Sequence, residues 1–337
     1  MTVCETALCL IVIFLHVAAG YIGGGVAGRF TKLMLVSVHF LSFAMPGFVF
    51  MSAMKQTLKY EAAPFEYGRF MLGRLRRVYA PYVIWTAVYY AFFTFVAHYF
   101  PFRFGDLLVY ILNGTLSAQF YFVIIVMQFY LITPLLAKFA RRVKPVPGLV
   151  AALLVTAAAK YFQIYFPAEL MPMPADYFFP MYMIYWMLGV YCGLCFENFT
   201  RFAKKRAAWL IAAFAAVAAL HLPMMYRAAM GASVYRLSEY VHILYRSCAV
   251  VALFAAAETL RPLSGKLARA VESLHARTFS VYLSHVLVLV ITTRAIDAIF
   301  PSLSPLIRFI FIAAPSFAVP FALAYAADWC RGAIRRG

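Results

Sequence analysis

The sequence contains few charged residues and very few acidic ones. Only 12% of its 337 residues are charged, and 12 Asp and Glu stand against 30 Lys and Arg. A soluble globular domain has about 25% charged and about 45–50% apolar residues, whereas 65% of this chain is hydrophobic. A soluble core cannot take up that much apolar surface. The composition therefore excludes an ordinary soluble domain.

Cysteine is also scarce, and its pattern argues against disulfide bonds and metal sites. The six cysteines lie mostly within apolar runs, where free cysteine behaves as a small buried hydrophobic residue. Cys192 and Cys195 form a C-x-x-C pattern, but they stand alone, and a structural zinc site needs about four ligands. We therefore expect no metal ion and no disulfide framework.

The N-terminal apolar run lacks the basic segment that begins a signal peptide. Glu5 is the only charged side chain before it, so we interpret residues 3–22 as a retained membrane span. The chain also lacks linkers, low-complexity tracts and short repeats. We therefore expect residues 1–337 to form a single membrane domain.

Several apolar segments are long enough to cross a bilayer, because a spanning helix needs about 20 mainly apolar residues. The sequence predicts an all-α polytopic membrane protein with about ten transmembrane helices. Residues 106–118 are too short to span and are expected to form an interfacial or re-entrant segment. The predicted spans are residues 3–22, 31–54, 78–100, 119–138, 147–167, 177–196, 207–225, 237–260, 277–298 and 306–329.

The loops between these spans alternate in charge. Lys and Arg concentrate in every second loop, for example in residues 55–77 and 201–206, whereas the intervening loops hold few and include Asp106 and Asp176. In membrane proteins the cytoplasmic loops carry the excess of Lys and Arg. We therefore expect both termini in the cytoplasm. The net charge of +18 indicates orientation in a lipid bilayer and not nucleic-acid binding.

Polar side chains inside the predicted spans indicate a functional site, because burying them in a bilayer is costly unless they are paired or solvated. His16 lies about six residues from the outer end of the first span, and His39 lies about eight residues into the second. A helix rises about 1.5 Å per residue. We therefore expect both imidazoles at a similar depth in adjacent antiparallel helices.

A second polar group is predicted in the eighth span. Glu239, His242 and Arg246 are spaced by three and four residues, which places them on one helix face. The outer halves of other spans add Lys160, Gln163 and Arg308. Together these residues predict a polar cavity open to the outside, although each of them could be a satisfied structural group.

Two further clusters each have two interpretations. His285 follows Tyr282 in the ninth span, and it either lines an inner cavity or caps a packed cluster of Tyr and Ser. Arg74, Arg76 and Arg77 stand just before the third span. They suffice as an orientation signal, or they form a cytoplasmic phosphate site, since the guanidinium group suits phosphate geometry.

Several stretches, taken in order along the chain, resemble one family. They are Ile11–His16, Met45–Ser52, Arg74–Trp85, Phe120–Tyr130 with Thr133 and Pro134, and Tyr282–His285. Their order and spacing are similar to those of the acyltransferase 3 family of bacterial integral membrane acyltransferases, over nearly the whole chain. The stretches at the third and fourth spans are most similar to the branch that acylates exopolysaccharides such as poly-N-acetylglucosamine.

This resemblance implies an O-acyltransferase of the bacterial cytoplasmic membrane. It would move an acyl group, acetyl or succinyl, from cytoplasmic acyl-CoA to a hydroxyl of a surface or secreted polysaccharide, with polysaccharide-synthesis proteins as partners. His16 matches the family's catalytic histidine, and Arg74, Arg76 and Arg77 fall in its basic motif near the CoA phosphates. The residues expected to line the active-site cavity are His39, Glu239, His242, Arg246, Tyr282 and His285.

Two positions depart from the family pattern. Members usually carry Arg eleven residues before the first-span histidine, where this chain has Glu5. The second-span motif usually ends Ser-Gly, whereas here it ends Ser52-Ala53. Both departures weaken a direct transfer of the family mechanism, and the missing Arg bears on whether this chain is active.

The implied chemistry leaves two mechanisms open for His16. As a general base, a neutral imidazole takes the proton of the acceptor hydroxyl; as a nucleophile, it accepts the acyl group and relays it. The oxyanion needs hydrogen-bond donors in either case, and Arg246, His39 or tyrosines are candidates. Because acyl-CoA is cytoplasmic and His16 is expected in the outer half, we expect a tunnel that meets at His16.

Two other functions remain open. Ten spans with intramembrane charges also fit a transporter or exporter of a glycan or small molecule, although the chain shows no internal repeat. An inactive scaffold in a polysaccharide complex would fit the missing Arg. Dependence on acyl-CoA separates the enzyme from a transporter, which should neither bind CoA nor consume acyl-CoA.

Overall fold

The computed structural model describes residues 1–22, 28–61, 65–166, 173–232, 235–260 and 264–334. These residues form helices and connecting turns, and no strand occurs among them. A chain in hydrocarbon must satisfy its backbone hydrogen bonds internally, and an α-helix does so within each segment. The predicted all-α class is confirmed.

The helices follow the predicted spans closely. Nine of the described helices are long and apolar enough to cross a membrane, and a bent pair makes a tenth, so the expectation of about ten spans is confirmed. The predicted end of the fifth span, residue 167, lies outside the described residues. The α-helices are α1 Thr2–Ala19, α2 Arg29–Leu41, α3 Ala44–Glu61, α4 Tyr67–Arg74, α5 Ala80–Ala91, α6 Phe104–Asn113, α7 Tyr121–Arg142, α8 Pro145–Tyr165, α9 Met183–Leu194, α10 Phe196–Lys205, α11 Ala207–Ala229, α12 Tyr235–Thr259, α13 Gly265–His275, α14 Thr278–Ile299 and α15 Pro305–Ile334.

Proline shapes the second and third spans. Pro46 has no backbone N–H to donate to the Ser42 carbonyl, and the second span breaks there between α2 and α3. Pro81 likewise cannot donate to the Arg77 carbonyl. Just before it the helix widens into a π-helical turn, η1 (Leu75–Tyr79), which closes with a bond from the Ala80 N–H to the Leu75 oxygen.

The sixth span ends in a sharp bend. A short 3₁₀ turn, η5 (Phe179–Tyr182), leads into α9, and α10 then departs at 102° after a break at Cys195. The basic residues that the sequence assigns to a cytoplasmic loop form the end of α10, including Lys204 and Lys205. The side of the membrane on which this loop and the termini lie stays a prediction.

The short apolar segment after the third span is a helix and does not reach membrane-spanning length. It forms α6, which is ten residues long, as the sequence predicts for a segment that does not span. Gly114 ends it with φ of 70°, a left-handed conformation that glycine adopts without strain.

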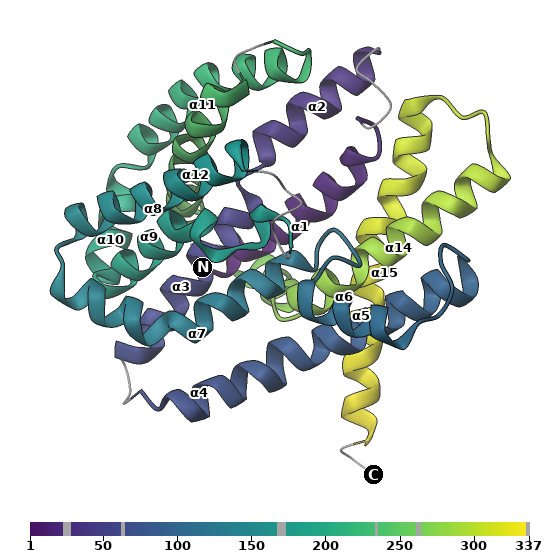
Figure 1. The fold of residues 1–337 in the computed structure, drawn as a ribbon, viewed down its shortest axis with the longest axis horizontal. Coiled ribbons are helices and arrows are strands. Elements are labelled where there is room, and N and C mark those ends of the chain that lie inside the picture. The colour runs from purple at the N-terminus through teal and green to yellow at the C-terminus, as the bar shows by residue number, and fades with distance from the viewer. Residues whose placement is uncertain (23–27, 62–64, 167–172, 233–234, 261–263, 335–337) are drawn as a thin grey trace. The chain divides into compact units, whose positions relative to one another are not determined.

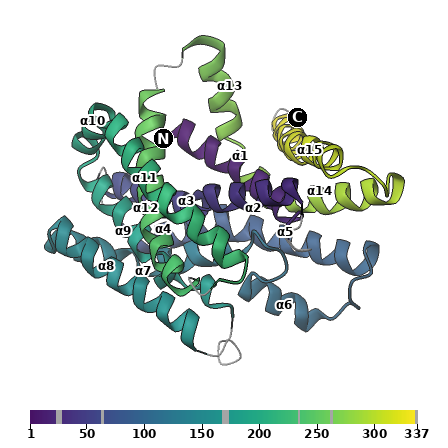
Figure 2. The same ribbon diagram turned by 90° about the horizontal axis from the view of Figure 1, so that it is seen from above.

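The described chain divides into two compact units. The first unit comprises Met1–Met45, Arg206–Ser238 and Val251–Gly337. In it α14 and α15 lie side by side, and α1 packs against both (Figure 1). Helix α1 also contacts α2 and α13, and Figure 2 shows α13 beside α1. The prediction of a single membrane domain stays a prediction.

The second unit comprises Pro46–Lys205 and Glu239–Val250. Helix α9 lies at its centre and packs against α7, α8 and η5. The indole of Trp186 in α9 is almost fully buried and stacks on the Phe129 ring of α7, with centroids 4.3 Å apart. Aromatic stacking of this kind fixes the relative rotation of the two helices.

Two glycines let α9 approach α3 closely. A Cβ added at Gly189 would collide with the backbone oxygen of Phe50 and lie 2.7 Å from Ala53 Cβ. A Cβ at Gly193 would lie 2.8 Å from Thr57 Cβ. Small residues spaced by four are typical of close helix contacts in membranes, where tight packing replaces the hydrophobic effect.

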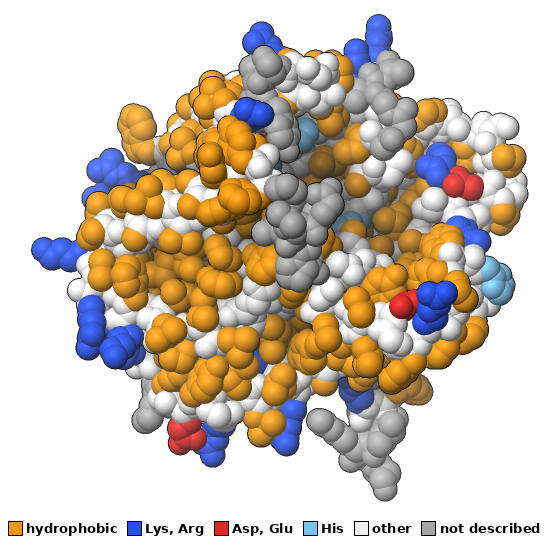
Figure 3. Space-filling view, in the orientation of Figure 1, with side chains coloured by type: hydrophobic (Ala, Val, Ile, Leu, Met, Phe, Trp, Pro, Cys, Tyr) orange, Lys and Arg blue, Asp and Glu red, His pale blue; other side chains and the backbone are white. Residues whose placement is uncertain are grey.

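The outer surface of the helices is largely apolar. Large hydrophobic side chains are exposed on many spans, for example Trp329 (74%), Leu135 (69%) and Ile84 (63%). Hydrophobic groups make up most of the side chains visible on the face drawn in Figure 3. A soluble monomer rarely exposes contiguous apolar patches of this extent. The surface therefore agrees with a lipid environment.

Candidate active site

Helices α1 and α14 bring the predicted catalytic histidine against a second histidine. The Cys9 thiol contacts the Thr278 backbone oxygen at 3.8 Å. Seven residues further along each helix, the His16 and His285 rings face one another with centroids 5.1 Å apart. The equal advance shows that the two helices run in parallel and in register, over a rise of about 10 Å.

This pairing corrects the depths that the sequence suggests. His16 is expected near the outer end of its span, whereas His285 is expected beside an inner cavity or in a packed cluster; the common level of His16 and His39 stays a prediction. The structure places His16 and His285 at one level. Depth counted from the ends of each helix ignores the axial offset between α1 and α14, and that offset depends on tertiary packing.

His285 is buried against the backbone of its own helix, beside Tyr282. Its side chain is 1% exposed, and its Nδ1 lies 2.8 Å from the Tyr282 oxygen and 3.2 Å from the Val281 oxygen. The Tyr282 ring stacks on Phe279. Both interpretations of His285, as a cap of a Tyr and Ser cluster or as a residue that lines a cavity with Tyr282, stay predictions.

Glu5, the departure from the family pattern, is buried and faces α13. Its carboxylate lies 3.5 Å from His275 Nε2, and its residue is 8% exposed. The acidic residue thus has a basic partner in this chain, although the family usually has Arg at that position.

A buried ion pair forms in the second unit. Lys160 of α8 is 8% exposed, and its Nζ lies 2.9 Å from the Glu239 carboxylate and 2.6 Å from Gln163 Oε1. The sequence predicts these three residues in the outer halves of the fifth and eighth spans. Their direct pairing satisfies the charges that a bilayer would otherwise make costly.

Replacing Lys160 by Met should destabilise the protein, because it leaves the Glu239 carboxylate without its partner. Breaking a buried ion pair by removing one partner costs about 3–5 kcal/mol. We expect a lower unfolding temperature in detergent for Lys160→Met. The double variant Lys160→Met/Glu239→Leu should recover most of the loss, and equal unfolding temperatures for all three proteins would show that the pair is not a stabilising contact.

Arg246 lies in α12 among tyrosines of the same unit. Its guanidinium interacts electrostatically with Tyr121, Tyr182 and Tyr185. Its Nε is buried and has no hydrogen-bond partner among the described residues. A guanidinium with spare donor capacity remains a candidate for binding a negatively charged group, and His242, which is 6% exposed, lies one turn before it.

Arg308 has a simpler explanation than a cavity. Its guanidinium donates two hydrogen bonds to the Asp297 carboxylate, at 2.7 and 2.8 Å, and its Cζ lies 5.3 Å from the Tyr21 ring centroid. Bidentate pairs of this kind are strong and geometrically specific. The pair joins α14 to α15, so Arg308 stabilises the packing of these two helices.

The predicted cavity residues divide between the two units. His39 lies in the last turn of α2, at the break before α3. The first unit holds His16, His39, Tyr282 and His285, and the second holds Glu239, His242, Arg246, Arg74, Arg76 and Arg77. The single outward cavity that the sequence suggests therefore stays a prediction.

A basic cavity opens beside the turn that carries the arginine cluster. Its volume is about 440 Å³, which falls in the usual range of about 300–1,000 Å³ for small-molecule sites. The residues that line it are Lys59, Tyr60, Phe65, Glu66, Arg69, Phe70, Gly73, Arg74 and Arg77. Its four cationic side chains outnumber one carboxylate, so the cavity favours an anion.

Aromatic rings hold Arg74 in this cavity. Its Cζ lies 5.0 Å from the centroids of both Phe70 and Tyr130, which is within the range of cation–π interaction. Arg77 is exposed and lines the cavity, whereas Arg76 is exposed and is not part of the lining. Of the three arginines that the sequence groups together, Arg74 and Arg77 line the cavity and Arg76 does not.

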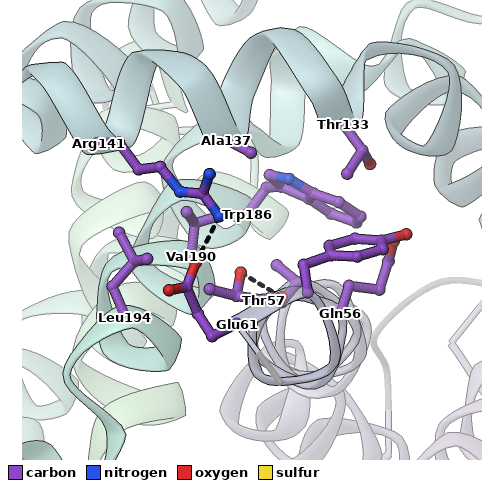
Figure 4. A pocket seen from close by; sticks show the side chains of 11 residues that line it. Gln56, Thr57, Glu61, Thr133, Ala137, Arg141, Trp186, Val190 and Leu194 are labelled. Carbon is purple, nitrogen blue, oxygen red and sulfur yellow. Dashed lines mark hydrogen bonds and ion pairs between the residues drawn. The ribbon is translucent and has the colours of Figure 1, made fainter. Parts of the chain in front are cut away.

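Two further cavities adjoin the basic one through shared residues. A cavity of about 280 Å³ shares Tyr60 and Phe65 with it and adds Lys138, Arg141 and Arg142. A much smaller one, of about 20 Å³, lies between α3, α7 and α9 beneath an ion pair of 2.7 Å between Arg141 and Glu61 (Figure 4). That volume is enough for about one water molecule, and Gln56, whose amide has no partner among the described residues, lines the cavity.

The sequence does not indicate several residues that line or pair at these sites. Lys59 and Arg69 belong to the predicted cytoplasmic loop, where positive charge is explained by orientation alone. Gln56 falls in the same predicted loop, and Asp297 lies at the end of the ninth predicted span, where only His285 and Tyr282 are singled out. Lys59 lies 15 residues before Arg74 in the sequence, and only the packing of α3 beside α4 shows that both line one cavity.

Comparison with known proteins identifies the family. A family model described as an acyltransferase domain matches residues 6–325, nearly the whole chain. No curated protein and no solved structure matches the sequence. The match includes His16 and His285, the arginines at and just before η1, and most or all of each apolar span, which suits a multi-pass membrane protein. The chain belongs to the acyltransferase 3 family.

Proposed function

We propose that this protein transfers an acyl group, acetyl or succinyl, from cytoplasmic acyl-CoA to a hydroxyl group of a surface or secreted polysaccharide. The observation that carries the proposal is the basic cavity beside η1, defined by Lys59, Arg69, Arg74 and Arg77. Within an acyltransferase family, the anionic group that such a cavity best fits is that of the acyl donor. The proposed location is the bacterial cytoplasmic membrane.

The chemistry of CoA suits this cavity. The nucleotide end carries a diphosphate and a 3′-phosphate, and guanidinium groups bind phosphate oxygens in bidentate fashion. The adenine ring can stack on aromatic side chains, and Phe65 and Phe70 line the same cavity. Glu66 is the one acidic lining residue and pairs with Arg69 at 3.6 Å, so Lys59, Arg74 and Arg77 remain as lining cations beyond that pair.

The reaction itself is assigned to His16. The imidazole takes the proton of the acceptor hydroxyl as that oxygen attacks the thioester carbonyl carbon. The C–S bond then breaks, and the proton passes to the departing CoA sulfur. Acyl transfer through an acyl-imidazole on His16 is the second possibility, and both forms need the same residue.

Loss of Arg77 should weaken CoA binding, because one charge-assisted phosphate contact disappears. Such a contact contributes about 1.5–3 kcal/mol, so the Kd for CoA of Arg77→Ala should rise about tenfold or more. Arg76→Ala removes the same charge from the same turn outside the cavity lining and is the matched control. Equal Kd values for the two variants, measured by calorimetry in detergent, would contradict the proposed donor site.

The acceptor is tested by glycan composition. Cells that lack the gene should lose ester-linked acyl groups from a surface or secreted polysaccharide, and the wild-type gene should restore them. A transporter or glycan exporter, the rival function, would change the amount of exported glycan and leave its degree of acylation unchanged. Polysaccharide-synthesis proteins are the proposed partners, and their co-purification with the enzyme would support that association.

A further inference from the structure

His285 occupies a defined tautomer when it is neutral. Its Nδ1 lies 2.8 Å from one backbone carbonyl oxygen and 3.2 Å from another, those of Tyr282 and Val281. Carbonyl oxygens only accept hydrogen bonds, so Nδ1 must carry the hydrogen. In the neutral ring Nε2 then carries a lone pair.

That lone pair has no partner among the described residues. Nε2 of His285 is buried and makes no hydrogen bond there, although buried polar atoms in proteins are nearly always paired. The neighbouring ring is that of His16, with centroids 5.1 Å apart and planes inclined by 52°. Catalytic hydrogen bonds are often long before substrate binds and shorten in the reacting complex.

Neither helix offers a carboxylate that could do the same work. In a Ser-His-Asp triad a carboxylate accepts the N–H of the catalytic histidine and fixes its orientation. On α1 and α14 the acidic residues are Glu5 and Asp297. They lie eleven and twelve residues from His16 and His285, or about 16–18 Å along the helices.

We propose that His285 is the positioning residue for His16, an inference that rests on the proposed function. Its Nε2 accepts the hydrogen bond of one His16 ring nitrogen, so that the other nitrogen of His16 presents its lone pair to the substrate. The proton of the acceptor hydroxyl moves to that lone pair, the new C–O bond forms as the C–S bond breaks, and the proton leaves with the CoA thiol. If His16 is acylated instead, its lone pair forms the C–N bond as the C–S bond breaks, and the N–H proton of the acylated ring passes through the same Nε2 to the departing CoA thiolate.

Two isosteric substitutions at position 285 separate this role from a structural one. His285→Gln keeps an amide oxygen near the place of Nε2 and loses the Nδ1 donor. His285→Asn keeps a donor near the place of Nδ1 and loses the Nε2 acceptor. The proposal expects Gln to retain most of the wild-type kcat and Asn to lose about 100-fold, with KM for acyl-CoA unchanged in both.

A purely structural role predicts the reverse order, because Asn alone preserves the bond to the Tyr282 carbonyl. A kcat for His285→Asn that equals or exceeds that of His285→Gln would therefore overturn the inference. Detergent unfolding temperatures identify a variant that has lost its fold, and the comparison then uses acyl transfer per folded molecule. If the wild-type protein transfers no acyl group from any acyl-CoA, the proposed function fails and not this assignment alone.

Discussion

The variant His16→Asn should lose acyl transfer almost completely while it inserts into the membrane as well as the wild type. General acid–base catalysis by a positioned imidazole contributes about 10²–10⁴-fold, and an asparagine amide cannot take a proton at neutral pH. The expected result is a fall in kcat of that size, measured as transfer of labelled acetyl from acetyl-CoA to saccharide in membranes. Binding of CoA should not change, because the basic cavity is intact.

His98→Asn is the matched control for this prediction. His98 is exposed, lies outside the described helices and has a positive φ of 52°, which asparagine tolerates better than most residues. It should keep wild-type activity. A His16→Asn protein that is present at wild-type levels and still acylates its acceptor would remove His16 from the mechanism.

The variant Gly189→Leu should abolish the stable fold of the second unit. Even the first added carbon would collide with the Phe50 backbone oxygen, and it would also lie 3.1 Å from the Met54 nitrogen. Backbone atoms cannot move aside as a flexible side chain can, so the cost should exceed the ~1–3 kcal/mol typical of an overpacked core. We expect little folded protein in size-exclusion chromatography after detergent extraction.

Gly68→Leu tests whether the effect belongs to the contact or to the substitution. A Cβ at Gly68 meets no atom within 4 Å, and leucine is a better helix former than glycine. This variant should elute and unfold like the wild type. Equal behaviour of the two variants would show that α3 and α9 do not depend on the close approach at Gly189.

Much of the fold follows from the sequence, because hydropathy alone sets where a chain can cross a bilayer. The ten predicted spans agree with the helices, and Lys160 and Gln163 lie together in the helix of the fifth span as the sequence places them. The bend at Cys195 was not predicted, since a basic stretch reads equally well as a loop or as a helix. The break before α3 follows from Pro46. The sequence does not show that this break leaves His39 in the last turn of α2.

The candidate site was less accessible to sequence reasoning. The polar residues within spans indicate His16 and His285 separately. That their rings lie against one another depends on the axial offset between α1 and α14, which the sequence does not give. The basic cavity needs α3 and α4 brought together, so Lys59 was attributed to membrane orientation. The spacing of Gly189 and Gly193 is visible in the sequence, yet it indicates a close contact only when α3 is known to lie opposite.

The most direct test of the account is acyl-CoA turnover by the purified protein in lipid vesicles. Released CoA thiol and ester-linked acyl groups on an added saccharide are measured together, with His16→Asn vesicles as the reference. With the wild-type protein, CoA thiol and ester-linked acyl groups should appear in equal amounts. With His16→Asn, neither product should appear. Vesicles of wild-type protein that neither bind CoA nor release its thiol, with a panel of saccharide acceptors present, would contradict an acyltransferase and favour a transporter or an inactive scaffold.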